Sequence, residues 1–153
     1  MRKQQSGKII NISSIGGSFG EPHGAWYHAT KYAVEGLSDS LRMELKQFGI
    51  DVVIIKPGAI LTEWNGIARE NLMQVSGGTA YGDLARKHVK MLAEADKRGS
   101  SPQVVAEAIY KAVASKRPKT RYAVGGGAKI ILFLRNILPD KLFDRLMLSL
   151  IKR

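Results

Sequence analysis

The sequence predicts an α/β fold built on parallel strands, and three observations support this prediction. Two short runs rich in β-branched residues, 7–13 and 51–56, flank a long amphipathic stretch over residues 25–48. Each run is almost continuously apolar, which is typical of strands that a parallel sheet buries on both faces. Glycine or proline residues follow each run and end it. The pattern therefore predicts a β-α-β unit whose two strands are parallel and adjacent.

The elements of this first unit follow one another closely along the chain. After the first predicted strand, residues 15–24 contain four glycines and one proline and are expected to form a loop. A helix is predicted over residues 25–48, with Gly49 placed to end it. Its apolar residues form one stripe: Ala33, Leu37, Leu41 and Leu45. The second predicted strand ends at Pro57 and Gly58. Residues 1–62 are therefore expected to form one β-α-β unit.

The middle of the chain has a weaker pattern. Residues 61–99 read as irregular, with a weakly helical stretch over 84–96 and interrupting glycines. Because this segment follows a strand whose end should face a ligand, we predict a substrate lid over residues 63–100. Its candidate contact residues are Trp64, Met73, Tyr81 and Met91. Local packing explains each of these four side chains equally well.

The last third contains a further helix, a third strand and a tail. Ser100-Ser101-Pro102 is expected to begin a helix, and residues 120–124 read as a strand, so that 101–128 form one segment. The tail, residues 129–153, holds two apolar segments separated by Pro139. The second has a broad apolar stripe: Leu142, Phe143, Leu146, Leu150 and Ile151. Three roles remain open for this amphipathic tail: closing a substrate pocket, packing on a partner subunit, or contact with an anionic membrane surface.

The composition is that of a folded globular domain. The 153 residues are 44% hydrophobic and 24% charged, which suffices for one domain with a core. There is no cysteine, and the three histidines are scattered, so we expect no metal site. The net charge of +11 lies almost entirely in residues 77–153, which carry +10. No nucleic-acid-binding motif accompanies this charge, and we therefore expect no nucleic-acid partner.

The N-terminal residues are basic but lack the apolar region of a signal peptide. The longest apolar run, residues 130–134, is far shorter than the roughly 20 residues of a membrane-spanning helix. We expect a cytoplasmic protein, with peripheral membrane contact as an open alternative.

The chemistry-bearing residues gather at one predicted edge of the sheet. Ser14, the start of the helix with Tyr27, and Pro57-Gly58 should all lie at the carboxyl ends of the strands, where α/β folds bind ligands. Tyr27 and Lys31 are one helical turn apart, about 5 to 6 Å. An ammonium near a phenol favours the phenolate, the form that acts as a base. The arrangement predicts proton transfer on an alcohol oxygen, a reaction that needs a hydride carrier.

With these residues the sequence resembles the short-chain dehydrogenase/reductase family. Three segments carry the resemblance: Asn11-Ile12-Ser13-Ser14, Tyr27-His28-Ala29-Thr30-Lys31, and Pro57-Gly58-Ala59-Ile60-Leu61-Thr62. The resemblance implies that Ser14 orients the substrate, that Tyr27 is the catalytic acid/base, and that Lys31 binds the nicotinamide ribose and assists Tyr27. It implies NAD or NADP as the cofactor, bound by Tyr27, Lys31, Pro57, Gly58, Ile60 and Thr62. Residues 122–125 and 138–140 are similar to bacterial members near the retinol and hydroxysteroid dehydrogenases.

The resemblance also has a large gap. The family begins with a strand and a Thr-Gly-x-x-x-Gly-x-Gly turn that holds the dinucleotide phosphates, and later carries Asn-Asn-Ala-Gly and a catalytic asparagine; none of these occurs here. Gly16-Gly17-Ser18-Phe19-Gly20 follows the wrong strand. The implied fold is therefore the C-terminal part of a Rossmann-like, doubly wound parallel sheet that lacks the N-terminal dinucleotide-binding strands.

Such a partial sheet leaves the first strand with an unpaired edge and uncovered apolar surface. We therefore expect either a homo-oligomer or a missing N-terminal half as partner, and weak or no NAD(P) binding by this chain alone. The predicted function is that of the catalytic and substrate-binding part of an NAD(P)-dependent oxidoreductase. It interconverts a small apolar alcohol and a carbonyl compound, with Tyr27 as acid/base. The alternative is a non-catalytic, truncated binding module that associates through its exposed sheet edge or its basic tail.

Overall fold

A computed structural model describes residues 1–152 and confirms the α/β class. Three strands, β1 (Gly7–Ile12), β2 (Ile50–Pro57) and β3 (Arg121–Val124), form a parallel sheet in the order β1-β2-β3. The helices are α1 (Ala25–Leu45), α2 (Glu63–Ser76), α3 (Gly82–Asp96), α4 (Gln103–Ala114), α5 (Ala128–Ile137) and α6 (Asp140–Lys152). Two short 3₁₀ helices, η1 (Ile15–Gly17) and η2 (Lys46–Phe48), complete the elements of the described chain.

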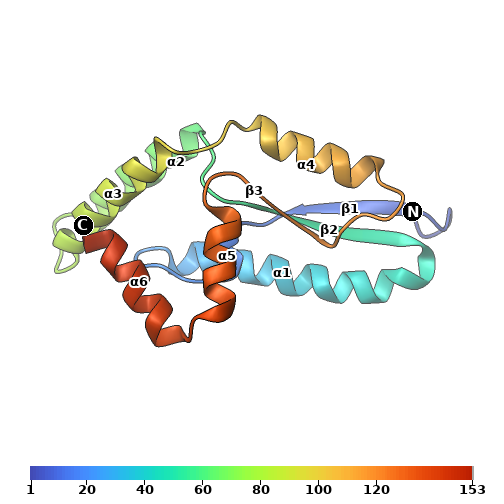
Figure 1. The fold of residues 1–153 in the computed structure, drawn as a ribbon, viewed down its shortest axis with the longest axis horizontal. Helices are drawn as coiled ribbons and strands as arrows, with labels where there is room; N and C mark the ends of the chain where they lie inside the picture. Colours follow the sequence, from blue (N-terminus) through green and yellow to red (C-terminus); the bar gives the residue numbers. More distant parts are fainter. Residues whose placement is uncertain (153) are drawn as a thin grey trace.

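The sheet lies between two layers of helix, with α1 along one face and α4 along the other (Figure 1). The central strand β2 is the most buried element, and Ile54 and Ile55 are completely inaccessible. Because side chains alternate along a strand, Val53 and Ile55 pack against Ala108 and Ala112 of α4. The intervening residues of β2 point towards α1. The predicted β-α-β unit is therefore present, with β1 and β2 parallel and adjacent.

The first strand is less buried than its sequence predicts. All but one of the residues of β1 are only partly covered, and Ile12 is 43% exposed. The reason is topological, because within residues 1–152 β1 pairs with β2 alone and occupies the edge of the sheet. A continuous apolar run indicated burial, but it did not distinguish the edge from the centre.

The side of α1 that meets the sheet is also different from the prediction. Leu37 of the predicted apolar stripe is 57% exposed and Ala33 is exposed, whereas His28, Glu35 and Ser38 are buried. Polar contacts hold this buried line in place: Ser38 Oγ, for example, accepts a hydrogen bond from Asn11 Nδ2 at 2.8 Å. An apolar stripe therefore predicted the wrong face, because α1 is attached to the sheet by hydrogen bonds and ion pairs.

Residues 61–99, predicted to be largely irregular, form two helices that pack against each other. Gly66 lies inside α2, and Gly77 and Gly78 lie between α2 and α3. A glycine inside a helix costs about 1 kcal/mol relative to alanine, which tertiary contacts can offset. Here Asp96 of α3 forms an ion pair with Arg69 and accepts a hydrogen bond from Asn65, both in α2. These contacts between the helices could not be read from the local pattern.

The tail packs onto the loop that follows β1. Phe143 and Met147 of α6 and Ala128 of α5 form a second core with Ile15 and Phe19. The Phe19 and Phe143 rings lie 5.6 Å apart. Of the predicted α6 stripe, Phe143 and Ile151 are buried, but Leu142 and Leu150 are 47% and 40% exposed. The two ends of the described chain lie at opposite ends of the molecule (Figure 1). None of the helices within residues 1–152 has the length and apolar character that crossing a membrane requires.

Candidate functional site

Ser14 lies where β1 ends and is held by backbone groups. The N–H of Ser13 donates to Ile55 O at 2.9 Å, so the chain is still paired with β2 at this point. Ser14 Oγ accepts a hydrogen bond from Gly16 N at 3.1 Å and caps η1. The same oxygen lies 3.4 Å from Pro57 O at the end of β2. The Ser14 hydroxyl is therefore fixed at the carboxyl edge of the sheet, as the sequence predicts.

Two glycines allow η1 to lie directly on α1. A Cβ atom at Gly16 would lie 3.1 Å from a ring carbon of Tyr27 and equally close to the His28 ring. At Gly17, a Cβ would lie 2.9 Å from Ser13 Oγ and 3.0 Å from the carbonyl of Lys31. Larger residues would push η1 away from the helix. As a result, Ser14 Oγ bonds to Gly16 and the Tyr27 ring lies close to the same glycine, although thirteen positions separate Ser14 and Tyr27 in the sequence.

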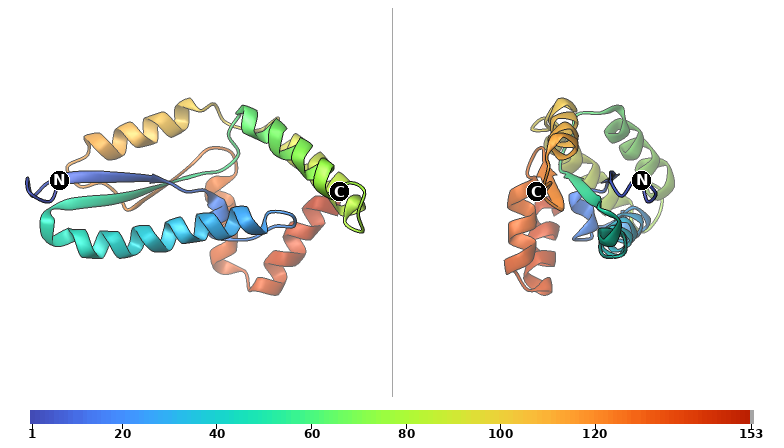
Figure 2. Two further views of the ribbon diagram at one scale, coloured as in Figure 1. Left: turned by 180° about the vertical axis from the view of Figure 1, so that it is seen from behind. Right: turned by 90° about the vertical axis from the view of Figure 1, so that its right-hand side faces the viewer.

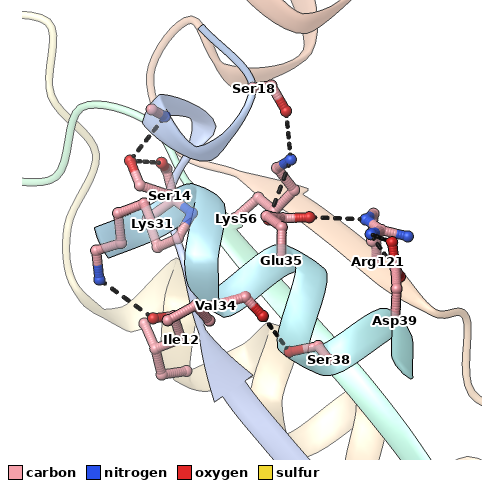
Figure 3. Close-up of polar contacts among 12 residues, drawn as sticks. Ile12, Ser14, Ser18, Lys31, Val34, Glu35, Ser38, Asp39, Lys56 and Arg121 are labelled. Atoms are coloured by element: carbon pink, nitrogen blue, oxygen red, sulfur yellow. Dashed lines mark hydrogen bonds and ion pairs between the residues drawn. The ribbon is translucent and has the colours of Figure 1, made fainter. Parts of the chain in front are cut away.

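Tyr27 and Lys31 lie in the first two turns of α1. The Lys31 ammonium is 5.8 Å from the centre of the Tyr27 ring and donates to Ile12 O at 3.2 Å, across the end of β1 (Figure 3). The Tyr27 ring is partly buried and lies 5.5 Å from the Trp64 ring of α2. The structure therefore brings Ser14, Tyr27 and Lys31 to one edge of the sheet, with Trp64 beside them.

The segment from Pro57 to Thr62 leads from this edge into α2. Gly58 donates to Val124 O at 2.8 Å, and a Cβ at Gly58 would lie only 2.4 Å from Gly126 O, so the close approach of the two strand ends requires glycine here. The carbonyl of Ile60 accepts a hydrogen bond from Asn65 Nδ2 at 2.9 Å. Thr62 is exposed and directly precedes α2.

These positions allow a test of whether the chain fits a nicotinamide cofactor. Lys31 and the backbone after Pro57 provide a cation and polar groups at one edge, which fits the nicotinamide and its ribose. The glycines of η1 do not offer a phosphate cradle, because the side chains of Tyr27 and His28 occupy the space above Gly16. Within residues 1–152, the fit therefore extends to the nicotinamide end of the cofactor.

His28 is a site residue that sequence reasoning missed. It is buried, its Nδ1 lies 2.8 Å from Gly16 O, and its Nε2 lies 3.2 Å from the N–H of Glu21. A backbone N–H can only donate, so Nε2 accepts and the proton is on Nδ1, which donates to Gly16 O. His28 thus joins both halves of the loop that carries Ser14 to the start of α1. The sequence shows that His28 follows Tyr27, but no sequence pattern indicates that its ring bonds to the backbone of Gly16 and Glu21.

A buried charge network was also missed (Figure 3). Lys56 of β2 lies 3.1 Å from a carboxylate oxygen of Glu35 in α1 and donates to Ser18 Oγ at 2.6 Å. Arg121 of β3 donates to Glu35 at 2.9 Å and to both oxygens of Asp39 at 2.7 and 2.8 Å. The network joins two strands, the helix that carries Tyr27, and the loop that follows η1.

The network shifts the pKa values of its outer members. Desolvation alone would lower the pKa of Arg121, but hydrogen bonds to Glu35 and Asp39 outweigh it and raise that pKa. Desolvation would likewise raise the pKa of Asp39, and hydrogen bonds from Arg42 and Arg121 reverse the effect and lower that pKa. Both groups are therefore stabilised in their charged forms.

Two histidines connect the loop before α1 to the predicted lid. His23 Nδ1 lies 3.2 Å from His88 Nδ1 of α3, and the ring of Tyr81 packs edge-on against His23. Glu21 lies 3.9 Å from His88 Nε2. Desolvation, followed by repulsion from His88, lowers the pKa of His23. Within residues 1–152, no group of three or more His, Asp or Glu side chains is placed to hold a metal ion.

Comparisons with known proteins show what the chain is similar to. The family model "short chain dehydrogenase" matches residues 1–72, which include Ser14, Tyr27, Lys31 and the Pro57–Thr62 segment. A 3-ketodihydrosphingosine reductase of Bacteroides thetaiotaomicron is 36% identical over 94% of this chain and 54% of its own length. An NADPH-dependent 3-dehydrocapnine reductase of Ornithobacterium rhinotracheale is 34% identical over 96% of this chain and 52% of its own length. Retinol dehydrogenase 16 of Mus musculus is 34% identical over 95% of this chain and 49% of its own length.

A solved structure extends the likeness to the whole described fold. The crystal structure of a short-chain dehydrogenase from Streptomyces avermitilis superposes with a TM-score of 0.68 at 30% identity, over 99% of this chain and 52% of that one. The chain spans about half the length of the curated relatives it matches. By its sequence and its fold, the chain belongs to the short-chain dehydrogenase/reductase family.

Proposed function

We propose that this chain forms the catalytic and substrate-binding part of an NAD(P)-dependent oxidoreductase that interconverts an alcohol and a carbonyl compound. The observation that carries the proposal is that Ser14 Oγ bonds to Gly16 while the Tyr27 ring occupies the space where a side chain at Gly16 would lie, with the Lys31 ammonium one helical turn beyond Tyr27. A hydroxyl donor, a phenol and a cation then face the same edge of the sheet. This is the set of groups that proton transfer on a substrate oxygen requires.

Each of the three side chains has a separate role in carbonyl reduction. The Ser14 hydroxyl donates a hydrogen bond to the carbonyl oxygen of the substrate; its present contact with Pro57 O, at 3.4 Å, is long and easily exchanged. The Tyr27 hydroxyl delivers its proton to the same oxygen as the alcohol forms. Lys31 stabilises the phenolate that remains. A nicotinamide cofactor, when bound, supplies the hydride that the carbonyl carbon receives. Oxidation of the alcohol reverses these transfers.

The residues proposed for the nicotinamide end are Tyr27, Lys31, Pro57, Gly58, Ile60 and Thr62. Lys31 reaches across the end of β1 to Ile12 O, and this position supports the proposal that its ammonium binds a ribose hydroxyl at the same edge. The backbone after Pro57 is held rigidly by Val124, Gly126 and Asn65, which favours a fixed orientation of the ring. Either NAD or NADP satisfies these contacts.

The substrate is proposed to be apolar. Trp64 of α2 lies beside Tyr27, and α2 and α3 together form the proposed lid, residues 63–100. Met73 and Met91 are partly buried in these helices, while Tyr81 is exposed and contacts His23. The names of three relatives, a 3-ketodihydrosphingosine reductase, a 3-dehydrocapnine reductase and a retinol dehydrogenase, support a long-chain or otherwise lipid-like alcohol or ketone.

A second candidate function is a non-catalytic binding module. Two observations favour it: within the described chain the outer edges of β1 and β3 are unpaired, and α1 exposes large apolar side chains, with Trp26 at 87% and Met43 at 69%. Such surfaces bind another chain, either a second copy or a separate polypeptide. This candidate predicts association without turnover.

Turnover with a defined stoichiometry separates the two candidates. The protein, as it is made in the cell, is supplied with NADH or NADPH and a panel of long-chain 3-ketones and retinoid aldehydes. The expected result is one alcohol formed for each cofactor oxidised, with at least one member of the panel. If no ketone or aldehyde is reduced and no alcohol is oxidised in the reverse assay, while the protein still associates with another chain, the binding-module function is favoured.

A further inference from the structure

A basic groove opens beside the third strand. The C-terminal half of α4, the loop after it, β3 and the start of α5 enclose a groove of about 940 Å³. Figure 2 shows α5 and α6, in orange and red, at one side of the fold. The groove opens at the start of α5, and its lining includes Ala108 and Ala128 of the two buried cores.

Five basic residues line this groove. Arg121 is paired with Glu35 and Asp39, and the other four are Lys111, Arg117, Lys119 and Lys129. All four residues are exposed, and Glu107 is the one acidic residue that lines the groove. Within residues 1–152 none of the four forms an ion pair. The groove therefore has a concentrated positive charge that the rest of the described chain does not neutralise.

An exposed apolar stripe adjoins the cations. Ile130, Phe133 and Ile137 occupy positions i, i+3 and i+7 of α5, and are 67%, 62% and 56% exposed. Ile130 also lines the groove, next in sequence to Lys129. The opposite side of α5 is anchored, because Ala128 is buried in the core with Phe143. The stripe is therefore held outward by a fixed helix.

We propose that this surface, the basic groove together with the α5 stripe, docks on the surface of an anionic lipid bilayer. Phosphate-bearing headgroups match the unneutralised cations, and the apolar side chains enter the boundary between headgroups and acyl chains. A nucleic acid would use the cations but would leave Ile130, Phe133 and Ile137 in water. The apolar stripe beside the cations thus selects the bilayer. The proposal does not depend on the chemistry assigned to Tyr27.

The docking surface differs from the one that the tail sequence suggests. The apolar face of α6 is largely used internally, since Phe143, Met147 and Ile151 are buried. Only α5 of the tail contributes apolar contacts, and three of the four cations precede the tail. The cations of α6, Lys141 and Arg145, are exposed but do not line the groove. They therefore provide a matched control.

Vesicle sedimentation tests the proposal. The protein is mixed with phosphatidylcholine vesicles that contain either no anionic lipid or about one third phosphatidylserine. We expect binding to the anionic vesicles alone, weakened by 0.5 M salt. Neutralising two groove cations with Lys119→Gln and Lys129→Gln should reduce the partition coefficient about 30-fold. The control, Lys141→Gln with Arg145→Gln, removes the same number of charges and should reduce it less than about threefold. Equal binding to both vesicle types, or equal loss in the two variants, would overturn the proposal.

A second measurement does not rely on removing charges. Because the sequence has no cysteine, Phe133→Cys introduces a single site for an environment-sensitive fluorophore. Its emission should shift to the blue when anionic vesicles are added, whereas a label at Leu37→Cys, on the exposed side of α1, should not shift. A blue shift at position 133 in the absence of vesicles that increases with protein concentration would show that a second copy covers the stripe, and would overturn the proposal.

Discussion

The ammonium of Lys56 in β2 lies 3.1 Å from a carboxylate oxygen of Glu35 in α1, and the two side chains are only 5% and 10% exposed. Lys56 also donates to Ser18 Oγ, just beyond η1. One buried contact thus connects the sheet, the helix that carries Tyr27 and Lys31, and the loop that carries Ser14. Because a buried charge without its partner is strongly unfavourable, the pair fixes these three parts relative to one another.

The first prediction concerns Glu35. Glu35→Ala leaves Lys56 without an acidic partner and leaves Arg121 with Asp39 alone. It should therefore lower the free energy of unfolding by about 3 to 5 kcal/mol. Urea denaturation measures this change. Glu44→Ala, an exposed glutamate of the same helix, is the control and should change the free energy by less than about 0.5 kcal/mol. A Glu35→Ala effect within about 1 kcal/mol of the control would show that the network is not essential to the fold.

The second prediction separates two adjacent serines. Ser14→Ala removes the hydroxyl proposed to orient the substrate oxygen and should lower kcat/KM about 100-fold. Ser13→Ala removes a buried hydroxyl that has no hydrogen-bond partner within the described residues, so activity and stability should change little. Both variants lose one oxygen atom. Equal kcat/KM values for the two variants would contradict the role of Ser14.

The third prediction concerns pH. Partial desolvation of the His23 ring, followed by repulsion from His88, lowers the pKa of His23 below its ordinary value, so the folded state resists protonation of this ring. Its contribution to stability is fully present above about pH 6.5, the value for an unperturbed histidine, and is lost as the pH falls below it. The free energy of unfolding should therefore decrease between pH 7.5 and pH 5. His23→Asn should reduce this decrease, and an unchanged decrease in the variant would argue against His23 as its source.

The fourth prediction is that the 153-residue chain by itself binds NAD(P) weakly. The space above Gly16 is occupied by Tyr27 and His28, and the fit of the described residues extends only to the nicotinamide end. A titration followed by NADH or NADPH fluorescence should not saturate below about 1 mM cofactor, which is the weak-binding end of ordinary KM values. Micromolar binding would show that this chain holds the phosphates with residues that have not been identified.

The parts of the site that could be predicted depend on short distances along the chain. Tyr27 and Lys31 share a helix face because their spacing is one turn, and Ser14 and Pro57 meet because both follow parallel strands. In each case the position of the residues within a helix, or at the end of a strand, already determines where they lie in the structure.

The parts that could not be predicted depend on contacts between distant residues. Glu35 and Lys56 look like ordinary surface charges, and only the fold shows that each is the other's partner. Leu37 appeared to face the core, but hydrogen bonds from β1 and ion pairs from β2 and β3 turn the polar line of α1 inward. Likewise, the helix α2 forms around Gly66 because Asn65 and Arg69 contact Asp96. None of these pairings leaves a signal in a single sequence.

The rate of the chemical step in Tyr27→Phe tests the proposed function most directly, when measured in a single turnover with saturating reduced cofactor and substrate. Tyr32→Phe, an exposed tyrosine of the same helix, is the matched control. If Tyr27 transfers the proton, the rate should fall by about 10² to 10⁴ relative to this control, with the free energy of unfolding little changed. A Tyr27→Phe rate within about tenfold of the Tyr32→Phe rate would contradict the assignment of Tyr27 as the acid/base group.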